Sequence, residues 1–191
     1  MPRPWDETIE AHRRGVRDAI LDTTAALVME QGLRSVTMSQ IAEQAAIGRA
    51  TLYRYFPDVE AILVAWHDKQ VAEHLAVLAD TRDRAEAGER IATVLETYAL
   101  LSHHSHGHVD AEVAAALHRS HQAAESERRV LRLLGDLFAD AARTGEVRTD
   151  VSPAELATFC IHALSAASSL RSKSAIRRLV ALTCAGLAPP A

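Results

Sequence analysis

Hydrophobic residues recur along most of this chain at the three- and four-residue spacing of amphipathic helices. The clearest case is the stretch 37–56, which predicts two short helices joined by a tight turn. Thr37 followed three residues later by Gln40 is a capping box, the usual signal of a helix start. After a short break the apolar spacing resumes, with Leu52 and Phe56 on one side of the second segment. This stretch therefore predicts a helix-turn-helix.

The rest of the chain predicts further helices, and we find no alternation typical of a β-strand. The helical segments outside the helix-turn-helix are expected at 10–31, 59–82, 91–101, 111–120, 125–143, 153–170 and 174–187. Together with the two short helices they make about nine. We therefore predict an all-α chain with a domain over 1–57, a second domain over 58–191, and residues 1–8 as a loose arm.

Buried faces and helix ends can be predicted for several segments. On the first helix the expected buried residues are Val16, Ala19, Ile20, Thr23 and Leu27. On the segment 125–143 they are Val130, Leu133, Leu134, Leu137 and Phe138. Gly32 and Gly145 are expected stops, and Ser152-Pro153 with Glu155 predicts the start of a helix. The histidines between 103 and 108 predict an interruption after the segment 91–101.

Composition is that of an ordinary globular protein, with 48% apolar and 24% charged residues. No apolar run approaches the ~20 residues of a membrane span. The beginning of the chain has no apolar signal region, so we expect a cytoplasmic location without a membrane. Cys160 and Cys184 lie in apolar helical patterns and are expected to be reduced core residues.

The net charge of −4 argues by itself against a nucleic-acid partner. However, residues 1–56 carry as many arginines as acidic residues, seven of each, so the negative excess lies beyond the helix-turn-helix. Arg3, Arg13, Arg14 and Arg17 cluster near the start of the first helix. A local basic patch would have to attract the phosphates of DNA.

The chain resembles the TetR family of transcriptional regulators. The resemblance rests on Thr37, Ile41-Ala42, Ala45, Thr51-Leu52-Tyr53 and Tyr55-Phe56, supported by Gly32-Leu33 and the turn 145–150. It implies a homodimer whose N-terminal three-helix domain places its third helix in the major groove of an operator. It also implies a C-terminal helical domain that binds a small-molecule effector and dimerises through its last two helices.

By this resemblance Ser39, Arg49 and Ala50 fall where bases are read, and Thr37, Thr51, Tyr53 and Tyr55 where phosphates are contacted. The residue chemistry agrees for Arg49, since a guanidinium at the start of a recognition helix can bond guanine in two places. Hydroxyl groups suit phosphate oxygens, which position a helix without specifying sequence. The DNA-binding candidates are Arg13, Thr37, Ser39, Gln40, Gly48, Arg49, Ala50, Thr51, Tyr53, Arg54 and Tyr55.

Three positions depart from the family pattern. Ala46 replaces the usual turn glycine, so a left-handed backbone there would be strained. Gly48 replaces the usual Ser or Thr cap, a tolerable change because glycine is a fair N-cap. Val59 stands where a phosphate-binding lysine is common, although the backbone amides of that helix end remain available to a phosphate. We expect modest overall affinity for DNA.

The effector site is the least readable part of the sequence. Polar or aromatic residues set among apolar ones are the candidates: Trp66, Tyr98, His118, His121, Phe138, Phe159 and His162. Each is more often plain core than a ligand contact. Arg128, Arg129 and Arg132 have the pattern of a solvated helix face.

A histidine-rich segment suggests a different kind of site. His103, His104, His106 and His108 are candidates for a metal site together with His118 and His121, which share one helix face. Densely spaced histidines near Gly and Ser are more often a solvated turn, and no HExxH or paired-cysteine pattern frames them. We assign no metal or cofactor.

We therefore predict a ligand-responsive regulator, acting as a repressor that a small molecule releases from a palindromic operator. A metal-responsive sensor or metal-binding helical protein built on the 103–121 histidines is the alternative. A helical adaptor that uses the helix-turn-helix only as a scaffold is a third. No set of nucleophile, base and orienting residue is present, so we do not expect an enzyme.

Overall fold

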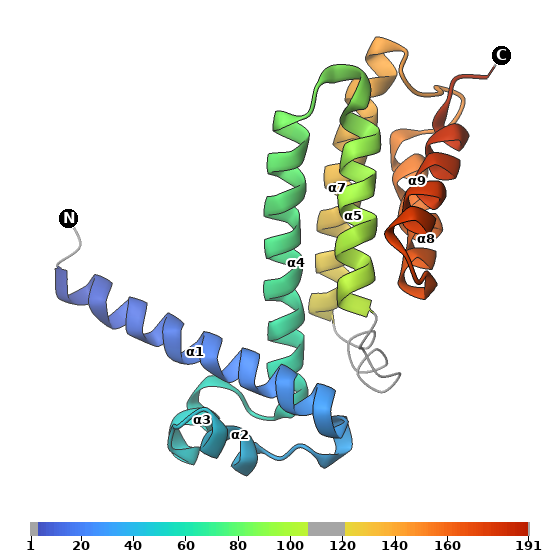
Figure 1. Cartoon of the computed structure of the whole chain (residues 1–191). Helices are drawn as coiled ribbons and strands as arrows, with labels where there is room; N and C mark the ends of the chain where they lie inside the picture. Colours follow the sequence, from blue (N-terminus) through green and yellow to red (C-terminus); the bar gives the residue numbers. More distant parts are fainter. Residues whose placement is uncertain (1–3, 107–120, 191) are drawn as a thin grey trace. The chain divides into compact units, whose positions relative to one another are not determined.

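The computed structural model describes residues 4–106 and 121–190 of the chain (Figure 1). Within these residues there are eight α-helices and no strand, which confirms the predicted all-α class. The helices are α1 (Pro4–Gln31), α2 (Met38–Gln44), α3 (Arg49–Tyr55), α4 (Val59–Arg84), α5 (Arg90–His106), α7 (His121–Thr144), α8 (Pro153–Ser165) and α9 (Lys173–Leu187). The predicted helix at 111–120 lies outside the described residues.

The described chain divides into two compact units. The first comprises residues 4–69 and 121–123, and the second comprises residues 70–106 and 124–190. Helix α4 continues from the first unit into the second. Each unit has its own hydrophobic core, and the two are described separately below.

Helices α1, α2, α3 and the beginning of α4 build the core of the first unit. Its buried members are Ile20, Leu21, Leu27, Val28, Val36, Ile41, Ala42, Leu52, Phe56, Ile62, Leu63 and Ala65. Thr24 is fully buried among the apolar residues of α1, and its hydroxyl donates to the carbonyl of Ile20 at 2.8 Å. That hydrogen bond removes the cost of an unpaired buried hydroxyl.

Two predictions for α1 were wrong. The helix begins at Pro4 and not near residue 10, since proline is well tolerated in the first turn of a helix. Ala19 is exposed and does not face the core. The buried stripe runs through Ile20, Leu21 and Thr24, so Ala19 falls on its solvent side.

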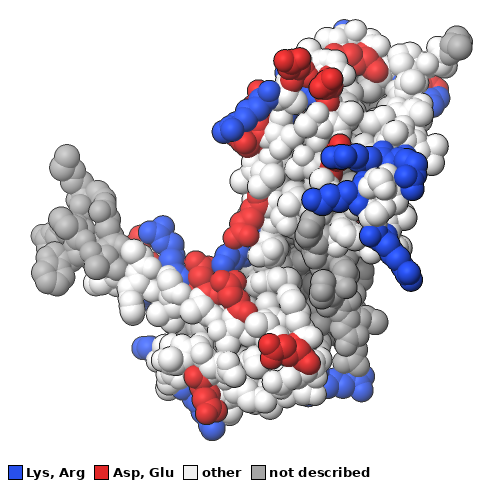
Figure 2. Space-filling model, in the orientation of Figure 1, with Lys and Arg blue, Asp and Glu red and all other residues white. Residues whose placement is uncertain are grey.

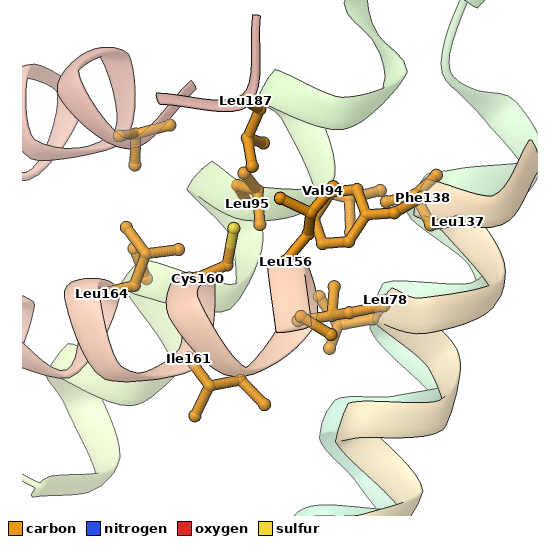
Figure 3. Packing of buried hydrophobic residues seen from close by; sticks show 14 of the residues in the cluster. Leu78, Val94, Leu95, Leu137, Phe138, Leu156, Cys160, Ile161, Leu164 and Leu187 are labelled. Atoms are coloured by element: carbon orange, nitrogen blue, oxygen red, sulfur yellow. The ribbon is translucent and has the colours of Figure 1, made fainter. Parts of the chain in front are cut away.

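Helices α5, α7, α8 and α9, with the end of α4, enclose the core of the second unit. In Figure 3 the side chains of Val94, Phe138 and Leu156, from three different helices, lie in one shared core. Figure 1 shows α5, α8 and α9 packed side by side, as their contacts confirm. Of the residues predicted inward on α7, Leu134, Leu137 and Phe138 are buried, whereas Val130 and Leu133 are half-buried.

Three helix boundaries differ from prediction in this unit. Helix α5 continues through the predicted histidine interruption to His106, because no Gly or Pro precedes Gly107 to stop it. Helix α7 begins at His121, four residues earlier than expected. Helix α8 ends at Ser165 and not near 170, and a 3-10 turn, Ala166–Ser169, follows it. There the Ser165 hydroxyl donates to the His162 carbonyl, the local competition that disfavours serine inside helices.

The two cysteines behave as predicted, since both are free thiols in the second unit. Cys160 is fully buried, and burial raises the pKa of its thiol to about 12. A thiol with so high a pKa is a poor nucleophile at neutral pH. Among the helices described, none combines the length and the apolar content that a membrane span requires.

Candidate nucleic-acid interface

The start of α2 is held by the predicted capping box. The Thr37 hydroxyl accepts from the Gln40 backbone N–H at 3.3 Å, and the Thr37 N–H donates to the Gln40 side-chain oxygen at 2.9 Å. These two bonds satisfy donors that a helix end otherwise leaves open. The Thr37 hydroxyl and the Gln40 side chain therefore already have hydrogen-bond partners within the protein.

The turn between α2 and α3 is a complete Schellman motif. Ala46 has a φ of 54°, the left-handed value that the sequence predicts to be strained, and no other described non-glycine residue has a positive φ. Its N–H donates to the Glu43 carbonyl at 3.1 Å, and the Ile47 N–H donates to the Ala42 carbonyl at 2.9 Å. This pair of bonds closes α2 and redirects the chain into α3.

Helix α3 has one face in the core and another in solvent. Leu52 is fully buried and Phe56, its C-cap, is 6% exposed. Arg49 and Tyr53 lie on the outside, and the Tyr53 side chain is 56% exposed. Gly48 is the N-cap, as predicted, and its carbonyl accepts from the Leu52 N–H at 3.0 Å. Buried apolar residues therefore fix the helix in the orientation that leaves its polar side free.

The remaining predicted DNA contacts are less uniformly exposed. Ala50 and Arg54 on α3 and Arg13 on α1 are exposed, while Ser39 on α2 is half-buried. The half-buried hydroxyl of Thr51 accepts from the Arg54 guanidinium at 3.4 Å. Tyr55 is half-buried and packs against the core.

Two contacts that the sequence did not predict tie α1 to its neighbours. The Arg17 guanidinium lies 5.4 Å from the centre of the Phe56 ring, within cation–π range. The Lys69 ammonium of α4 lies 3.5 Å from Asp18 and 3.3 Å from Asp22 on α1. Burial opposes the charged form of Lys69, but the hydrogen bond and charge of Asp22, with those of Asp18, outweigh it and raise the Lys69 pKa. Residues so far apart in the sequence produce no helical periodicity from which their contact could be predicted.

The start of α4 follows the breaker Pro57, and Asp58 is its N-cap, as the sequence predicts. The Asp58 carboxylate accepts from the Ala61 N–H at 2.8 Å and so caps the helix. A capping carboxylate occupies one amide and brings negative charge to the position where a phosphate would bind. Figure 2 shows both acidic and basic side chains on the face of the first unit in view, and no continuous basic surface there.

The effector candidates that the structure describes belong to both units. Trp66 packs on the core of the first unit, whereas Phe138 is fully buried in that of the second. Phe159 is 47% exposed on α8, where His162 is exposed as well. Tyr98 is half-buried on α5, and burial raises the pKa of its hydroxyl although a hydrogen bond with Ser102 opposes the shift.

Of the candidate metal histidines, the structure describes the side chain of His103. The His103 ring contacts the Ala167 carbonyl through Nδ1 at 3.0 Å, which ties α5 to the turn after α8. The side chains of the other metal and effector histidines, His104, His106, His108, His118 and His121, lie outside the described residues. Among the side chains that are described, no group of three or more His, Cys, Asp or Glu is arranged to hold a metal ion.

A helix-turn-helix that keeps an arginine- and tyrosine-bearing face open to solvent is the site of a DNA-binding class of protein. Two family models match the chain. Residues 20–66 match the model described as bacterial regulatory proteins of the tetR family. Residues 86–189 match the C-terminal domain described as that of an SbtR-like transcriptional regulator. The chain belongs to the TetR family, whose members are DNA-binding transcriptional regulators and not enzymes.

Individual relatives agree with this assignment. The chain is 28% identical to a fatty acid metabolism regulator protein of Bacillus subtilis. The match extends over 80 residues, which is 41% of this chain and 41% of the relative. It is 31% identical over 96 residues to the repressor KstR2 of Rhodococcus jostii, covering 48% of this chain and 46% of the relative. The chain thus matches less than half the length of these curated relatives.

Solved structures share the fold over nearly the whole chain. The fatty acid degradation regulator FadR of Bacillus halodurans superposes with a TM-score of 0.76 at 16% identity, covering 88% of this chain and 94% of the other. The ketosteroid regulator KstR2 of Mycobacterium tuberculosis gives a TM-score of 0.64 at 19% identity, covering 90% and 94%. At these identities the likeness concerns the fold alone.

Proposed function

We propose that the chain is a homodimeric repressor that binds a palindromic operator through α3 and is released by a small-molecule effector. The observation that carries the proposal is the split of α3, with Leu52 buried and Arg49 and Tyr53 in solvent. A recognition helix needs this arrangement, because its apolar side must anchor it while its polar side enters the groove.

The exposed residues of α3 divide by chemistry into two roles. Arg49, in the first turn, would bond a guanine edge, a contact that discriminates by about 1–3 kcal/mol. Tyr53 lies one turn further on, where its hydroxyl suits a phosphate oxygen. Thr51 and Arg54 act as a pair, since the guanidinium already bonds the hydroxyl. Thr37 and Gln40 are better suited to holding α2 than to reading bases.

The homodimer is supported by an apolar surface on the last two helices. Leu182 is 72% exposed on α9 and Phe159 is 47% exposed on α8. The Phe159 ring lies over Gly186, where an added Cβ would meet it at 3.4 Å. Gly186 follows Leu182 by four residues, so these two residues share one face of α9, and the Phe159 ring of α8 lies beside it. Large apolar side chains left in solvent together mark a contact surface, here for a second copy.

Release by an effector requires a ligand that binds the DNA-bound and free states with different affinities. The second unit would hold that ligand, with Tyr98 as the best-placed of the predicted contacts, because it joins a half-buried hydroxyl to an apolar core. Two relatives are named as regulators of fatty acid metabolism or degradation, which supports a largely apolar effector.

The proposal is tested by selecting DNA from a random-sequence pool with the purified full chain, then measuring affinity by fluorescence anisotropy over a range of salt. We expect an inverted-repeat consensus and a logarithmic affinity that falls steeply with the logarithm of salt concentration, because phosphate contacts release counterions. Absent or salt-independent binding would favour the helical adaptor. Native mass spectrometry of protein purified from cells would show a retained effector, or a metal if the alternative sensor is correct.

A further inference from the structure

The second unit contains a cleft that the proposed function does not use. Its volume is about 450 Å³, within the range of small-molecule sites. It lies where the end of α4, the start of α5 and the end of α7 meet. Figure 2 shows acidic and basic side chains next to one another over this end of the unit. None of the described effector candidates lines it.

Arg90 is the unusual residue of this cleft. Its Nε is buried and has no hydrogen-bond partner, the one such side-chain atom found within the described residues. The guanidinium donates through Nη2 to the neutral carbonyl of Ala85 at 3.3 Å. Among the described residues no carboxylate pairs with Arg90. A buried donor without an acceptor costs about 1–3 kcal/mol, more when it is charged, so its presence requires an explanation.

The acidic residues of the cleft are, by contrast, already engaged. Asp83 pairs with Arg82 at 3.1 Å, and Asp140 pairs with Arg143. Glu146 accepts from the Thr144 hydroxyl at 2.8 Å. Each carboxylate of the cleft therefore already has a partner, whereas the Arg90 Nε has no acceptor.

The remaining wall of the cleft is apolar. Leu137 and Ala141 lie one turn apart on α7 and are buried, and half-buried Ile91 follows Arg90 on α5. The carboxylates that line the cleft outnumber its arginines by three to two, which disfavours a dianion such as phosphate. A monoanion with an apolar body fits both the orphan donor and this wall.

We propose that this cleft binds a small monocarboxylate, with the carboxylate on the Arg90 guanidinium and the apolar body against Leu137 and Ala141. A planar guanidinium presents parallel N–H groups that match a carboxylate in two places, and binding would give the buried Nε its acceptor. The site is separate from α3 and requires no DNA.

The test is isothermal titration of the full chain with benzoate, using benzamide as the neutral isostere and inorganic phosphate as the dianion. We expect benzoate to bind and the other two not to bind. Arg90→Gln should weaken benzoate binding by about tenfold or more, because a charged hydrogen bond is lost. Arg84→Gln is the matched control, since Arg84 lies in the same turn as Arg82 but pairs with Asp80 outside the cleft.

Arg90→Lys keeps the positive charge but loses the planar donor pair, so it should retain weak binding even if Arg90→Gln fails to fold. Circular dichroism of each variant monitors folding. Failure of benzoate to bind the wild-type chain, or equal binding by all three variants, would overturn the proposal. Neither result affects the DNA-binding proposal, which is measured by anisotropy without benzoate.

Discussion

Single side chains decide which face of α3 meets the protein and which meets solvent. Leu52 and Tyr53 are adjacent in sequence, yet the first is fully buried and the second is 56% exposed. A helix turns its successive residues by about 100°, so one apolar anchor is enough to orient its polar neighbours outward. Arg49 is exposed as well, and it lies one turn before Tyr53 on the same side of the helix.

The first prediction at this scale concerns base recognition. Arg49→Ala should weaken operator binding by about 1–3 kcal/mol and relax the preference for one base pair in each half-site. Anisotropy with the selected operator and with single-base variants measures both effects. Arg84→Ala, an exposed arginine of the second unit, is the control. An unchanged affinity and base preference in Arg49→Ala would remove α3 from the role of reader.

The second concerns the strained turn. Ala46 has a left-handed backbone that costs an L-residue roughly 1–2 kcal/mol. Glycine would remove this cost, although its more flexible unfolded state would cancel part of the gain. Ala46→Gly should therefore raise the free energy of unfolding by up to about 1 kcal/mol. Urea denaturation measures the change, and Ala50→Gly, in an exposed position of α3, should have the opposite sign. Destabilisation by Ala46→Gly would contradict this account of the turn.

At the scale of elements, capping decides where helices begin. Helices α2 and α8 both start with a capping box, from Thr37 and Gln40 in one and Ser152 and Glu155 in the other. The Ser152 hydroxyl donates to the Glu155 carboxylate at 2.6 Å, and the Ser152 N–H donates at 3.0 Å. Side-chain and then backbone hydrogen bonds from Ser152 hold the pKa of Glu155 below its ordinary value.

This lowered pKa predicts a pH dependence. A carboxyl group whose pKa is lower in the folded state stabilises the fold above its unfolded pKa, and the contribution disappears as pH falls through the folded pKa. Glu155→Gln should therefore be less stable than wild type at pH 7, and the difference should shrink as pH drops below 4.5. Thermal unfolding at several pH values measures it, with Glu10→Gln on α1 as the exposed control. A difference that does not depend on pH would exclude the carboxylate as its source.

At the scale of the whole molecule, the proposed dimer depends on a surface to which both of the last helices contribute. Leu182→Glu should convert the dimer to monomer, because a charge would be buried at the centre of the contact. Size-exclusion chromatography with light scattering measures the mass. Val77→Glu is the matched control, since Val77 is 46% exposed on α4, away from α8 and α9.

Loss of the dimer should also lower operator affinity, because a monomer contacts one half-site only. A Leu182→Glu protein that keeps the wild-type mass and affinity would place the dimer contact elsewhere. Monomeric wild-type protein would contradict the homodimer itself.

The all-α class and the helix-turn-helix could be predicted from sequence because their signals are local. A capping box spans four residues, a buried stripe repeats within one helix, and a stop needs one glycine, as Thr37, Leu52 and Gly32 illustrate. The predicted end of α5 was wrong because the polar histidines after residue 101 were interpreted as an interruption of the helix. A helix continues through such residues when nothing specific stops it.

Contacts between distant segments were decided only by the tertiary structure. Lys69 meets Asp22 across 47 positions, and the cleft at Arg90 needs the end of α7 beside the start of α5. That the Arg90 Nε is buried without an acceptor likewise depends on how α4, α5 and α7 pack. Helical periodicity specifies the side of a helix that is buried, whereas the partner on that side depends on the path of the whole chain.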